Sequence, residues 1–502
     1  MEFQPFYLVL SFTIFTLSLI KWTWKSFPST KTMKLPPSPP TLPVLGNLHQ
    51  LGLYSHKSLC SLSQKHGPLM LLKFGTRPVV VASTSKVARE IMKTHDLSFS
   101  DRPKFTTSDK LLYQGRDVST APYGEYWRQM RSVCVLKLLS NKMVLSFSNV
   151  REEETEIFME KVRCSTSSSL PVNLSEMFAC YTNDVVCRIA LGRKYSEGMG
   201  GKKFKLLLGD LMELLGSFTL GDFIPWLSWL NSINGFDAKV DRVAKEFDEF
   251  LNKVLEEHMD NSKTNEDEDK DFVDVMLNLR KNHTAPGFSL EMVNVKAMLL
   301  DMFAAGTDTT YTVLEWVMSE LLRNPNIMKK VQDEVRGIAN PKHNIKDSEL
   351  DQIPYLRAVI KETLRLYPPI PLLVPRSSTV NVELNGYDIP AGTPIFTNAW
   401  AIGRDPKTWD EPEKFVPERF LQCPVDFKGH HYELIPFGAG RRGCPGIGFT
   451  TATVELLLAN LVRRFDWSLP GGAKGEDLDM TQCPGLTIHR KIPLIVEATL
   501  SF

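Results

Sequence analysis

The sequence lacks paired cysteines of the CxxC type, and its eight cysteines in 502 residues are too few for a disulfide-stabilised fold. Its net charge is only +1, so no nucleic acid or other polyanion is expected as a partner. No GxGxxG fingerprint follows a strand pattern, which indicates that any nicotinamide reductant acts through a separate protein. No internal repeat is present. These absences leave a chain with reduced thiols that faces a cytosol-like environment.

One uncharged, mostly apolar run stands out near the start, at Pro5–Ile20. A membrane-spanning helix needs roughly 20 residues, so this run is long enough if Trp22 and Trp24 lie at the interface. Lysines follow the run, which predicts a cytosolic body. The alternative is a cleaved signal peptide, but basic residues do not precede the run and no small-residue cleavage site follows it. We predict a retained anchor over residues 1–24.

A proline-rich segment, "LPPSPPTLPVLGN", follows at Leu35–Asn47. Its five prolines favour stiff, extended chain, which suits either a plain linker or a rigid hinge that sets the body on the membrane. Residues 25–47 are therefore predicted to be a basic and proline-rich hinge. Although the length suggests about two to four average domains, no loop is long enough to separate them. Residues 48–502 are predicted to be one large catalytic domain.

Most segments after about Thr84 show apolar residues at helical spacing, which predicts a mainly α fold with small β-sheets. A strand pair is predicted at Pro68–Gly75 and Arg77–Ser83, and short strands with turns at Val380–Asn398. Pro394 restricts its strand to an edge or a strand end. The polar stretches Ser165–Ser169 and Asn265–Asp271 are predicted to be solvated loops.

Cys444 lies in an unusual setting, "PFGAGRRGCPG". Glycines 438, 440 and 443 permit close approach and positive φ before the sulfur. A helix pattern begins just after it, so free N–H groups and the helix dipole, together with Arg441 and Arg442, favour a thiolate. That thiolate suits a nucleophile or a metal ligand, and the alternative is a structural loop cysteine.

Two kinds of metal site follow from a single cysteine. A tetrahedral zinc site needs three more ligands, and only His430 and His431 are near, at poor spacing. A haem needs only one axial protein ligand, and a cysteine thiolate is one of its known ligands. Haem is therefore the better prediction for Cys444.

The cysteine stretch resembles the haem-loop signature of the cytochromes P450, the haem-thiolate monooxygenases. Other motifs of that family occur in order: "WRQMR", "AAGTDTT", "KETLRLYPP" and "FVPERF". The resemblance therefore covers essentially the whole chain and implies the cytochrome P450 fold. The wording of the anchor, of "PPSPP" and of the cysteine loop is similar to the plant microsomal A-type branch, in particular the seventy-one family.

The resemblance implies a structural network and a haem-binding set. Glu362 and Arg365 are i, i+3 on a helix and can pair, with Arg419 as the third member, although such a pair alone is common by chance. Haem propionates need basic partners and indole or guanidinium donors. The residues implied at the haem are Trp127, Arg131, Arg376, Arg442, Phe437 and, with surface exposure as an equal alternative, Arg102.

A long helix pattern carries small residues in its middle, followed by Asp308 and Thr309. Small residues let a plane approach the helix, and Thr hydroxyls can take over backbone carbonyls and open the helix locally. The simpler alternative is tight helix packing. By resemblance we predict a dioxygen pocket in which Asp308 and Thr309 deliver protons.

The substrate pocket is implied by resemblance alone, and ordinary core packing is the alternative for each residue. Because its residues are nearly all apolar, the substrate is expected to be lipophilic. The implied lining is Leu111, Leu112, Tyr113, Phe303, Ala304, Ala305, Ile370, Leu372, Leu373, Val374, Leu486 and Thr487. The stretch Leu220–Asn231, with two tryptophans, is implied to cover the pocket and touch the membrane.

Together these patterns predict an anchored enzyme on the endoplasmic reticulum that binds haem b and O2. It would hydroxylate, epoxidise or oxidatively cyclise a plant metabolite such as a terpenoid, indole alkaloid or phenylpropanoid. Electrons would come from NADPH through cytochrome P450 reductase, with cytochrome b5 as an optional donor and Arg441 at the docking surface. Two alternatives stay open: a haem-thiolate isomerase or dehydratase without external electrons, and a non-catalytic haem-binding sensor.

Overall fold

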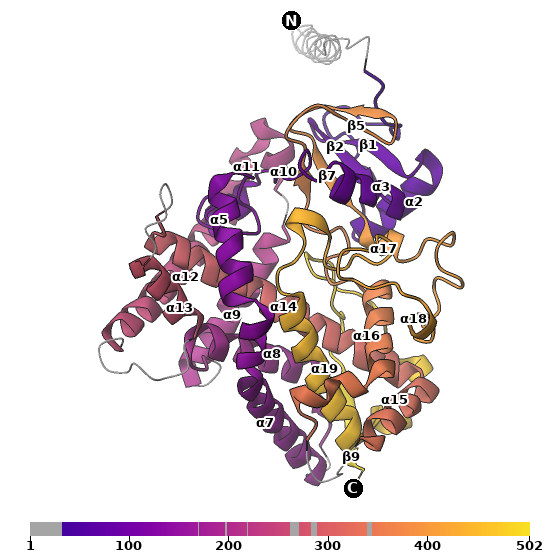
Figure 1. The fold of residues 1–502 in the computed structure, drawn as a ribbon. Coiled ribbons are helices and arrows are strands. Elements are labelled where there is room, and N and C mark those ends of the chain that lie inside the picture. The colour runs from indigo at the N-terminus through magenta and orange to yellow at the C-terminus, as the bar shows by residue number, and fades with distance from the viewer. Residues whose placement is uncertain are drawn as a thin grey trace, which may run out of the picture.

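The computed structural model describes residues 33–168, 170–195, 198–217, 219–261, 271–282, 289–338 and 344–501. Figure 1 shows a mainly helical body with a sheet at the end nearest the N-terminus, as the sequence predicted. The predicted anchor, residues 1–24, and the first part of the hinge lie outside the described residues.

Helices make up most of the body. The α-helices of the first half are α2 (Ser55–His66), α3 (Ser85–Arg89), α4 (Thr106–Leu111), α5 (Glu125–Val133), α6 (Asn141–Ser146), α7 (Ser148–Ser167), α8 (Leu174–Leu191), α9 (Gly198–Leu215), α10 (Leu220–Phe223), α11 (Trp229–Ile233) and α12 (Phe236–Asn261). Those of the second half are α13 (Phe272–Asn282), α14 (Met292–Arg323), α15 (Pro325–Gly337), α16 (Pro354–Leu366), α17 (Ala399–Ile402), α18 (Arg419–Gln422) and α19 (Ile447–Arg464).

Shorter helical turns join these elements. The 3-10 turns are η1 (Leu48–Gln50), η4 (Pro225–Leu227), η5 (Asp347–Gln352), η6 (Gly440–Arg442), η7 (Pro470–Gly472) and η8 (Gly475–Asp477). Two π-helical turns, η2 (Glu90–Thr94) and η3 (Cys134–Leu138), continue α3 and α5.

The main sheet confirms the predicted strand pair. Its strand order is β1-β2-β7-β4, where β1 (Leu69–Phe74) and β2 (Arg77–Ala82) are antiparallel. Strand β7 (Pro394–Thr397) enters from the second half of the chain, runs parallel to β2 and pairs on its other side with β4 (Arg376–Ser377) (Figure 1). Because Pro394 is the first residue of β7, its missing N–H is tolerated although the strand is internal.

The other sheets are small. The hairpin of β5 (Val382–Leu384) and β6 (Tyr387–Ile389) turns at Asn385 and Gly386, both at positive φ, as the sequence predicted. The third sheet has the order β3-β9-β8, from β3 (Val172–Asn173), β8 (Phe465–Ser468) and β9 (Ile495–Leu500).

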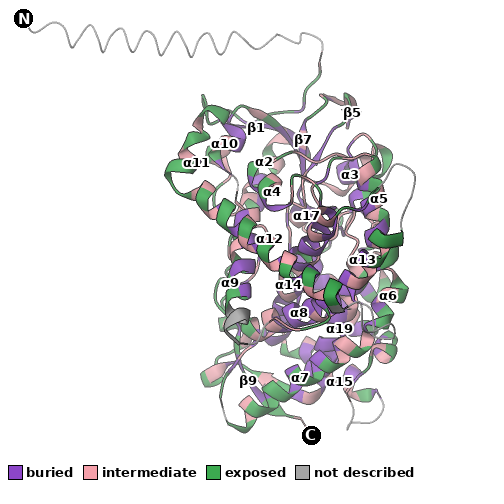
Figure 2. Cartoon of the chain, turned by 90° about the vertical axis from the view of Figure 1, so that its left-hand side faces the viewer, coloured by how far each residue is buried: buried purple, intermediate pink, exposed green. Residues whose placement is uncertain are grey.

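Helix α14 runs through the interior and is buried along most of its length (Figure 2). Its Trp316 is fully buried, stacks on Tyr367 at 4.2 Å and donates to the carbonyl of Ile488 at 2.7 Å. Gly306 lets α14 approach α8, because a Cβ there would lie 3.0 Å from a methyl group of Val186. The small residues of α14 therefore serve helix packing at this point.

The described part of the hinge is bonded to the body. The amide of Asp388 donates to the carbonyl of Lys34 at 2.7 Å, and the amide of Lys34 donates to the carboxylate of Asp388 at 2.7 Å. The amide of Leu71 donates to the carbonyl of Pro37 at 2.9 Å. The side chain of Asn47 holds the carbonyl of Pro40 at 3.2 Å and accepts from the amide of Lys73 at 2.7 Å. These contacts fit a rigid hinge better than a free linker.

One of the two predicted loops is wrong. The residues Ser165–Ser167 continue α7, because their hydroxyls donate to carbonyls one turn earlier and so satisfy the helix locally. Most of the stretch Asn265–Asp271 lies outside the described residues, and its last residue, Asp271, precedes α13.

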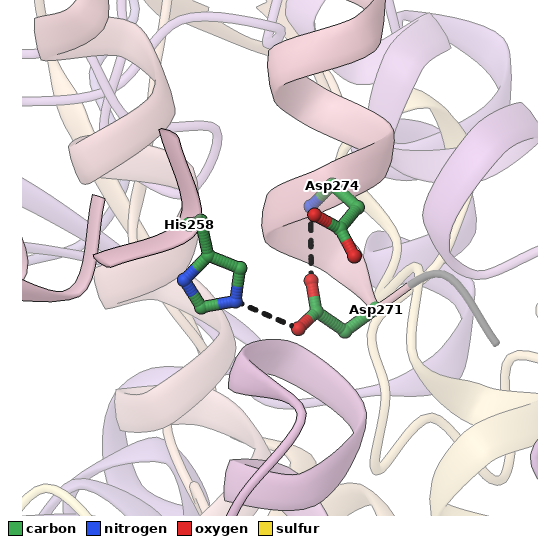
Figure 3. Close-up of side chains that lie close together, drawn as sticks. All are labelled: His258, Asp271 and Asp274. Carbon is green, nitrogen blue, oxygen red and sulfur yellow. Dashed lines mark hydrogen bonds and ion pairs between the residues drawn. The ribbon is translucent and has the colours of Figure 1, made fainter. Parts of the chain in front are cut away.

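Asp271 links the end of α12 to the start of α13 (Figure 3). One of its oxygens accepts from the amide of Asp274 at 2.9 Å, and the other lies 2.9 Å from Nε2 of His258. His258 Nδ1 lies 2.7 Å from the carbonyl of Val254. Burial opposes the imidazolium, yet Asp271 raises the pKa of His258. The side-chain nitrogen and oxygen atoms of His258, Asp271 and Asp274 lie as close together as the ligands of a metal ion. The hydrogen bonds already explain the arrangement, because Asp271 acts as a helix cap.

Within the described residues, no single helix is both long and apolar enough to cross a bilayer. One bent pair, Glu125–Ser146 with Ser148–Ser167 at 59°, has a suitable length and composition.

The predicted pair of Glu362 and Arg365 lies on α16 and is fully buried. Arg365 binds both carboxylate oxygens of Glu362, at 2.7 and 2.8 Å, and Arg419 binds Glu362 at 3.1 Å. Arg365 also donates to the carbonyls of Gly403, Pro412 and Lys414, which fixes the irregular chain between α17 and α18. Every charged group of this network has a partner, so the loss of one member would leave another buried charge unpaired.

Glu362→Ala should destabilise the protein by about 3–5 kcal/mol, because it leaves the guanidinium of Arg365 buried without its countercharge. Chemical denaturation with circular dichroism measures the change, and recovery in the insoluble fraction is the expected outcome if the remaining stability is too small.

Glu160→Ala is the matched control, because Glu160 forms the same i, i+3 pair with Arg163 on the exposed face of α7. Its denaturation midpoint should equal that of the unmodified chain. A Glu362→Ala protein that folds with an unchanged midpoint would contradict a structural role for the network.

Candidate active site

Backbone hydrogen bonds hold the Cys444 loop in place, and at one position the conformation of the loop permits only glycine. The amide of Cys444 donates to the carbonyl of Phe437 at 2.9 Å, and that of Gly443 to Gly440 at 3.0 Å. Gly440 has φ +65°, and a Cβ there would lie 2.3 Å from the carbonyl oxygen of Met92. The loop therefore packs directly against η2, and α19 begins three residues after the sulfur.

The thiol of Cys444 differs from the sequence-based expectation. The amide of Gly446 does donate to its sulfur at 3.3 Å, as a helix N-terminus predicts. Burial nevertheless raises the pKa of Cys444, and Gly446 and Arg131 only partly offset it. Of the two loop arginines, Arg441 is exposed beside Asp96. This thiol is poorly suited to be a free nucleophile, whereas a metal cation bound to it would favour the thiolate.

Four arginines gather beside the Cys444 loop, as the sequence implied. Arg131 donates to the carbonyl of Gly443 at 2.6 Å, and Arg376 pairs with Asp96 at 2.8 Å. Arg442 donates to the carbonyl of Ala121 at 2.6 Å and lies over the ring of Trp127, 4.2 Å from its centroid.

Arg102, the fourth, is part of the site and not a surface residue. It donates to the carbonyl of Ser119 at 2.9 Å and to that of Val374 at 2.6 Å. Burial, together with the charges of Arg442 and Arg376, holds its pKa well below the usual range. Burial also lowers the pKa of Arg442 to about 10, despite Asp101.

The charges at this site do not balance. The buried arginines repel one another, and mainly Asp96, Asp101 and Asp117 oppose them. Such a cluster favours an anionic ligand with more than one carboxylate. The two propionates of haem, with the sulfur of Cys444 on the same cavity, fit this arrangement of residues.

A cavity of about 250 Å³ joins these groups. Its predicted lining residues are Arg102, Trp127, Arg131, Ala305, Thr309, Ile370, Leu373, Val374, Arg376, Phe437, Arg442 and Cys444. Leu373 is at φ +53°, which is uncommon for a bulky residue, and its amide closes a turn onto Ile370 at 3.0 Å. Most of the remaining lining residues are apolar.

Thr309 lines the cavity and Asp308 does not, and neither residue breaks helix α14. The helix is continuous from Met292 to Arg323, and the Thr309 hydroxyl donates to the carbonyl of Ala305 at 2.6 Å. The local opening of the helix that the sequence predicted is therefore limited to the carbonyl of Ala305, which accepts this hydroxyl bond. Asp308 accepts a short hydrogen bond from Thr487. Burial raises the pKa of Asp308, although Thr487 and the charge of His489 lower it.

The remaining pocket residues are not brought to the cavity wall. Phe303 is fully buried against Phe204 and Phe250. Tyr113 donates to Asp248 at 3.0 Å. The others pack in the apolar core, against α9 or beside Asp308: Leu111, Leu112, Ala304, Leu372, Leu486 and Thr487.

The sequence analysis missed Asp301 and Cys134, which also line the cavity. Asp301 accepts from the amide of Val118 at 2.6 Å, and burial with the charge of Asp117 raises its pKa to about 8. It stands seven residues before Asp308, so helical spacing was a signal for it. Cys134 opens the π-helical turn after α5, and no sequence signal marks such a turn.

Comparisons with known proteins agree with this site. The family model described as "Cytochrome P450" matches residues 36–495. "Cytochrome P450 736A117" of Prunus mume is 57% identical over 501 residues, covering 98% of this chain and 96% of the relative. "Cytochrome P450 71A6" of Nepeta racemosa is 51% identical and covers 95% and 96%. A "Norfluorocurarine oxidase" of Strychnos sp is 50% identical and covers 97% and 96%. The predicted likeness to the seventy-one family is thus confirmed.

Solved structures share the fold. "Zebra fish cytochrome P450 another structure with Abiraterone" superposes with a TM-score of 0.76 at 26% identity, covering 89% of this chain and 99% of that one. A second zebra fish structure, with progesterone, gives the same TM-score at 25% identity and the same coverage. The family model, the plant relatives and the cysteine loop at the cavity agree: the chain belongs to the cytochrome P450 family and is a haem-dependent monooxygenase.

Proposed function

We propose that this enzyme hydroxylates, epoxidises or oxidatively cyclises a small lipophilic plant specialised metabolite, such as a terpenoid, indole alkaloid or phenylpropanoid. The observation that carries the proposal is the cavity itself, whose lining combines the thiol of Cys444 with mainly apolar residues. An apolar wall with few polar groups selects a lipophilic ligand. The relative named a norfluorocurarine oxidase supports the oxidation of a plant metabolite.

Each group of residues has its own role in this proposal. Haem would supply dioxygen activation when bound, and Cys444 would hold its metal. Arg102, Arg131, Arg376 and Arg442 would bind its two propionates. Asp308 and Thr309 deliver the protons that the cleavage of dioxygen consumes. The apolar wall excludes water and orients the substrate.

Electrons come in this proposal from NADPH through cytochrome P450 reductase, with cytochrome b5 as an optional donor. The chain has no dinucleotide fingerprint of its own, which supports a separate reductase. Arg441 is exposed on the outer side of the cysteine loop and suits an acidic partner.

The proposed location is the endoplasmic reticulum membrane, with a cytosolic body on the anchor of residues 1–24. Exposed apolar side chains gather around the described start of the chain: Val44 is 49% exposed, Trp226 61% and Trp229 55%. The segments that carry them are neighbours, because backbone amides of the turn after β1 donate to the carbonyls of both Leu45 and Phe223. Such a face suits a lipid surface.

Microsomes that contain the protein should convert one of the three proposed metabolite classes only when O2, NADPH and reductase are all present. Mass spectrometry of products identifies the class. Turnover without NADPH would instead support an isomerase or a dehydratase.

Cys444→Ser should abolish both turnover and the thiolate-type spectrum of the reduced carbon monoxide complex, because a serine hydroxyl is a poor haem ligand. Cys60→Ser, at a half-buried cysteine of α2, is the matched control and should keep both. Retention of both by Cys444→Ser would refute the ligand assignment.

Thr309→Ala should bind haem and substrate nearly normally but lose product per NADPH by roughly 10²-fold, with oxygen released mainly as peroxide. Product, NADPH and peroxide are measured together. Thr166→Ala removes an equivalent hydroxyl-to-carbonyl bond on α7 and serves as the control. An unchanged product ratio in Thr309→Ala would mean that this threonine only packs the helix.

Protease added to intact microsomes should digest the body, because the lysines after the apolar run predict a cytosolic body. Immunoblotting follows the loss, and a lumenal protein that stays intact until detergent is added is the control. Protection of the body in intact microsomes would reverse the proposed topology.

A further inference from the structure

The segment Thr487–Arg490 runs along one face of α14. At one end Thr487 donates to Asp308, and at the other the amide of Arg490 donates to Glu315 at 2.9 Å. Asp308 and Glu315 are seven residues apart, so both carboxyl groups lie on the same face of the helix. The segment thereby holds Ile488 and His489 between the two positions at which it is bonded to these carboxyl groups.

The imidazole of His489 packs against Tyr311, with ring centroids 5.7 Å apart. Its Nδ1 has no exposed surface and no hydrogen-bond partner in the part of the chain that the structure describes. Its charge lowers the pKa of both Asp308 and Glu315, against the upward effect of burial on each. A buried polar nitrogen without a partner is uncommon and calls for a ligand, a water or a proton-transfer role.

We propose that His489 passes protons from the protein surface to Asp308, and thereby replenishes the acid used in dioxygen cleavage. This inference rests on the proposed role of Asp308. When Asp308 has given up its proton, the Nδ1–H bond of a doubly protonated His489 breaks and an O–H bond forms on the carboxylate. The ring keeps its proton on Nε2, and rotation about the Cβ–Cγ bond then brings the deprotonated Nδ1 to solvent, where it takes up one proton; no electrons are transferred.

The other titratable groups around His489 are less suited to this transfer. Glu315 is already bound by Ser175 and by the amide of Arg490. Burial and the charge of Asp308 raise the pKa of Tyr311 far above neutrality. On its own segment, Arg490 donates to Ile492 at 3.2 Å, and Cys483 binds the His489 backbone through its amide. Histidine is also the side chain that most readily exchanges protons near neutral pH.

The first test is spectroscopic and needs no turnover. Infrared spectra of the resting protein, recorded across pH, should contain a carboxylic acid band that Asp308→Asn removes. In His489→Gln this band should titrate at higher pH than in the unmodified chain, because the cation that lowers the pKa of Asp308 is gone. His66→Gln, at a half-buried histidine of α2, should leave the titration unchanged. An unchanged titration in His489→Gln would overturn the proposal.

The second test measures product per NADPH from pH 6 to 9. His489→Gln should lower this ratio by about 10-fold, below the full effect of an acid–base group, with the larger loss at the acidic end of the range, where an imidazole carries the proton that it donates. The double variant with Asp308→Asn should be no worse than Asp308→Asn alone, since both act on one path.

The outcomes separate two failures. If Asp308→Asn leaves the ratio unchanged, the proposed function of Asp308 is wrong. If Asp308→Asn lowers the ratio and His489→Gln does not, only the role of His489 is overturned. Additive losses in the double variant would also overturn it, because they would place the two residues on separate paths.

Discussion

The buried pair of Glu362 and Arg365 is the interaction on which the rest of the structure depends. Its charges have no access to water, so each must be met by the protein. Arg365 meets three backbone carbonyls of the chain between α17 and α18, and Glu362 accepts from the amide of Val416 at 2.8 Å and from Arg419. A long irregular segment thus acquires a fixed path without regular secondary structure, and the cysteine loop comes after it, beyond α18.

A second constraint is the imbalance of charge around the cavity. Buried arginines normally stand beside carboxylates, but here Arg102 is bonded mainly to backbone carbonyls. The protein thereby places positive charge in the lining of an apolar cavity that also contains the sulfur of Cys444. A flat, dianionic metal complex satisfies both features, since its carboxylates neutralise the arginines and its metal binds the thiolate.

Helix α14 carries three acids at intervals of seven residues; the first faces the loop before α5, and the other two face the segment Thr487–Arg490. Asp301 holds the amide of Val118, Asp308 is bound by Thr487, and Glu315 by the amide of Arg490. The same face of one helix therefore positions the loop before α5 and the segment after η8. A heptad interval keeps the three acids in line because 3.6 residues make one helical turn.

The sequence by itself determined the local structure and the chemistry of the motifs. Periodicity predicted α14, α16 and α19, two short apolar stretches predicted β1 and β2, and the i, i+3 spacing predicted the pair on α16, because each pattern depends only on neighbours along the chain. Only the tertiary structure decided which apolar residues form a cavity wall. Leu373 and Phe303 are both apolar, and the resemblance placed both in the pocket. In the structure Leu373 lines the cavity, whereas Phe303 fills the core. Contacts such as that of Asp301 with Val118 join residues 183 positions apart, and burial reversed the expected pKa shift of Cys444. Apolarity favours removal from water in either place, and only the three-dimensional packing fixes where space remains.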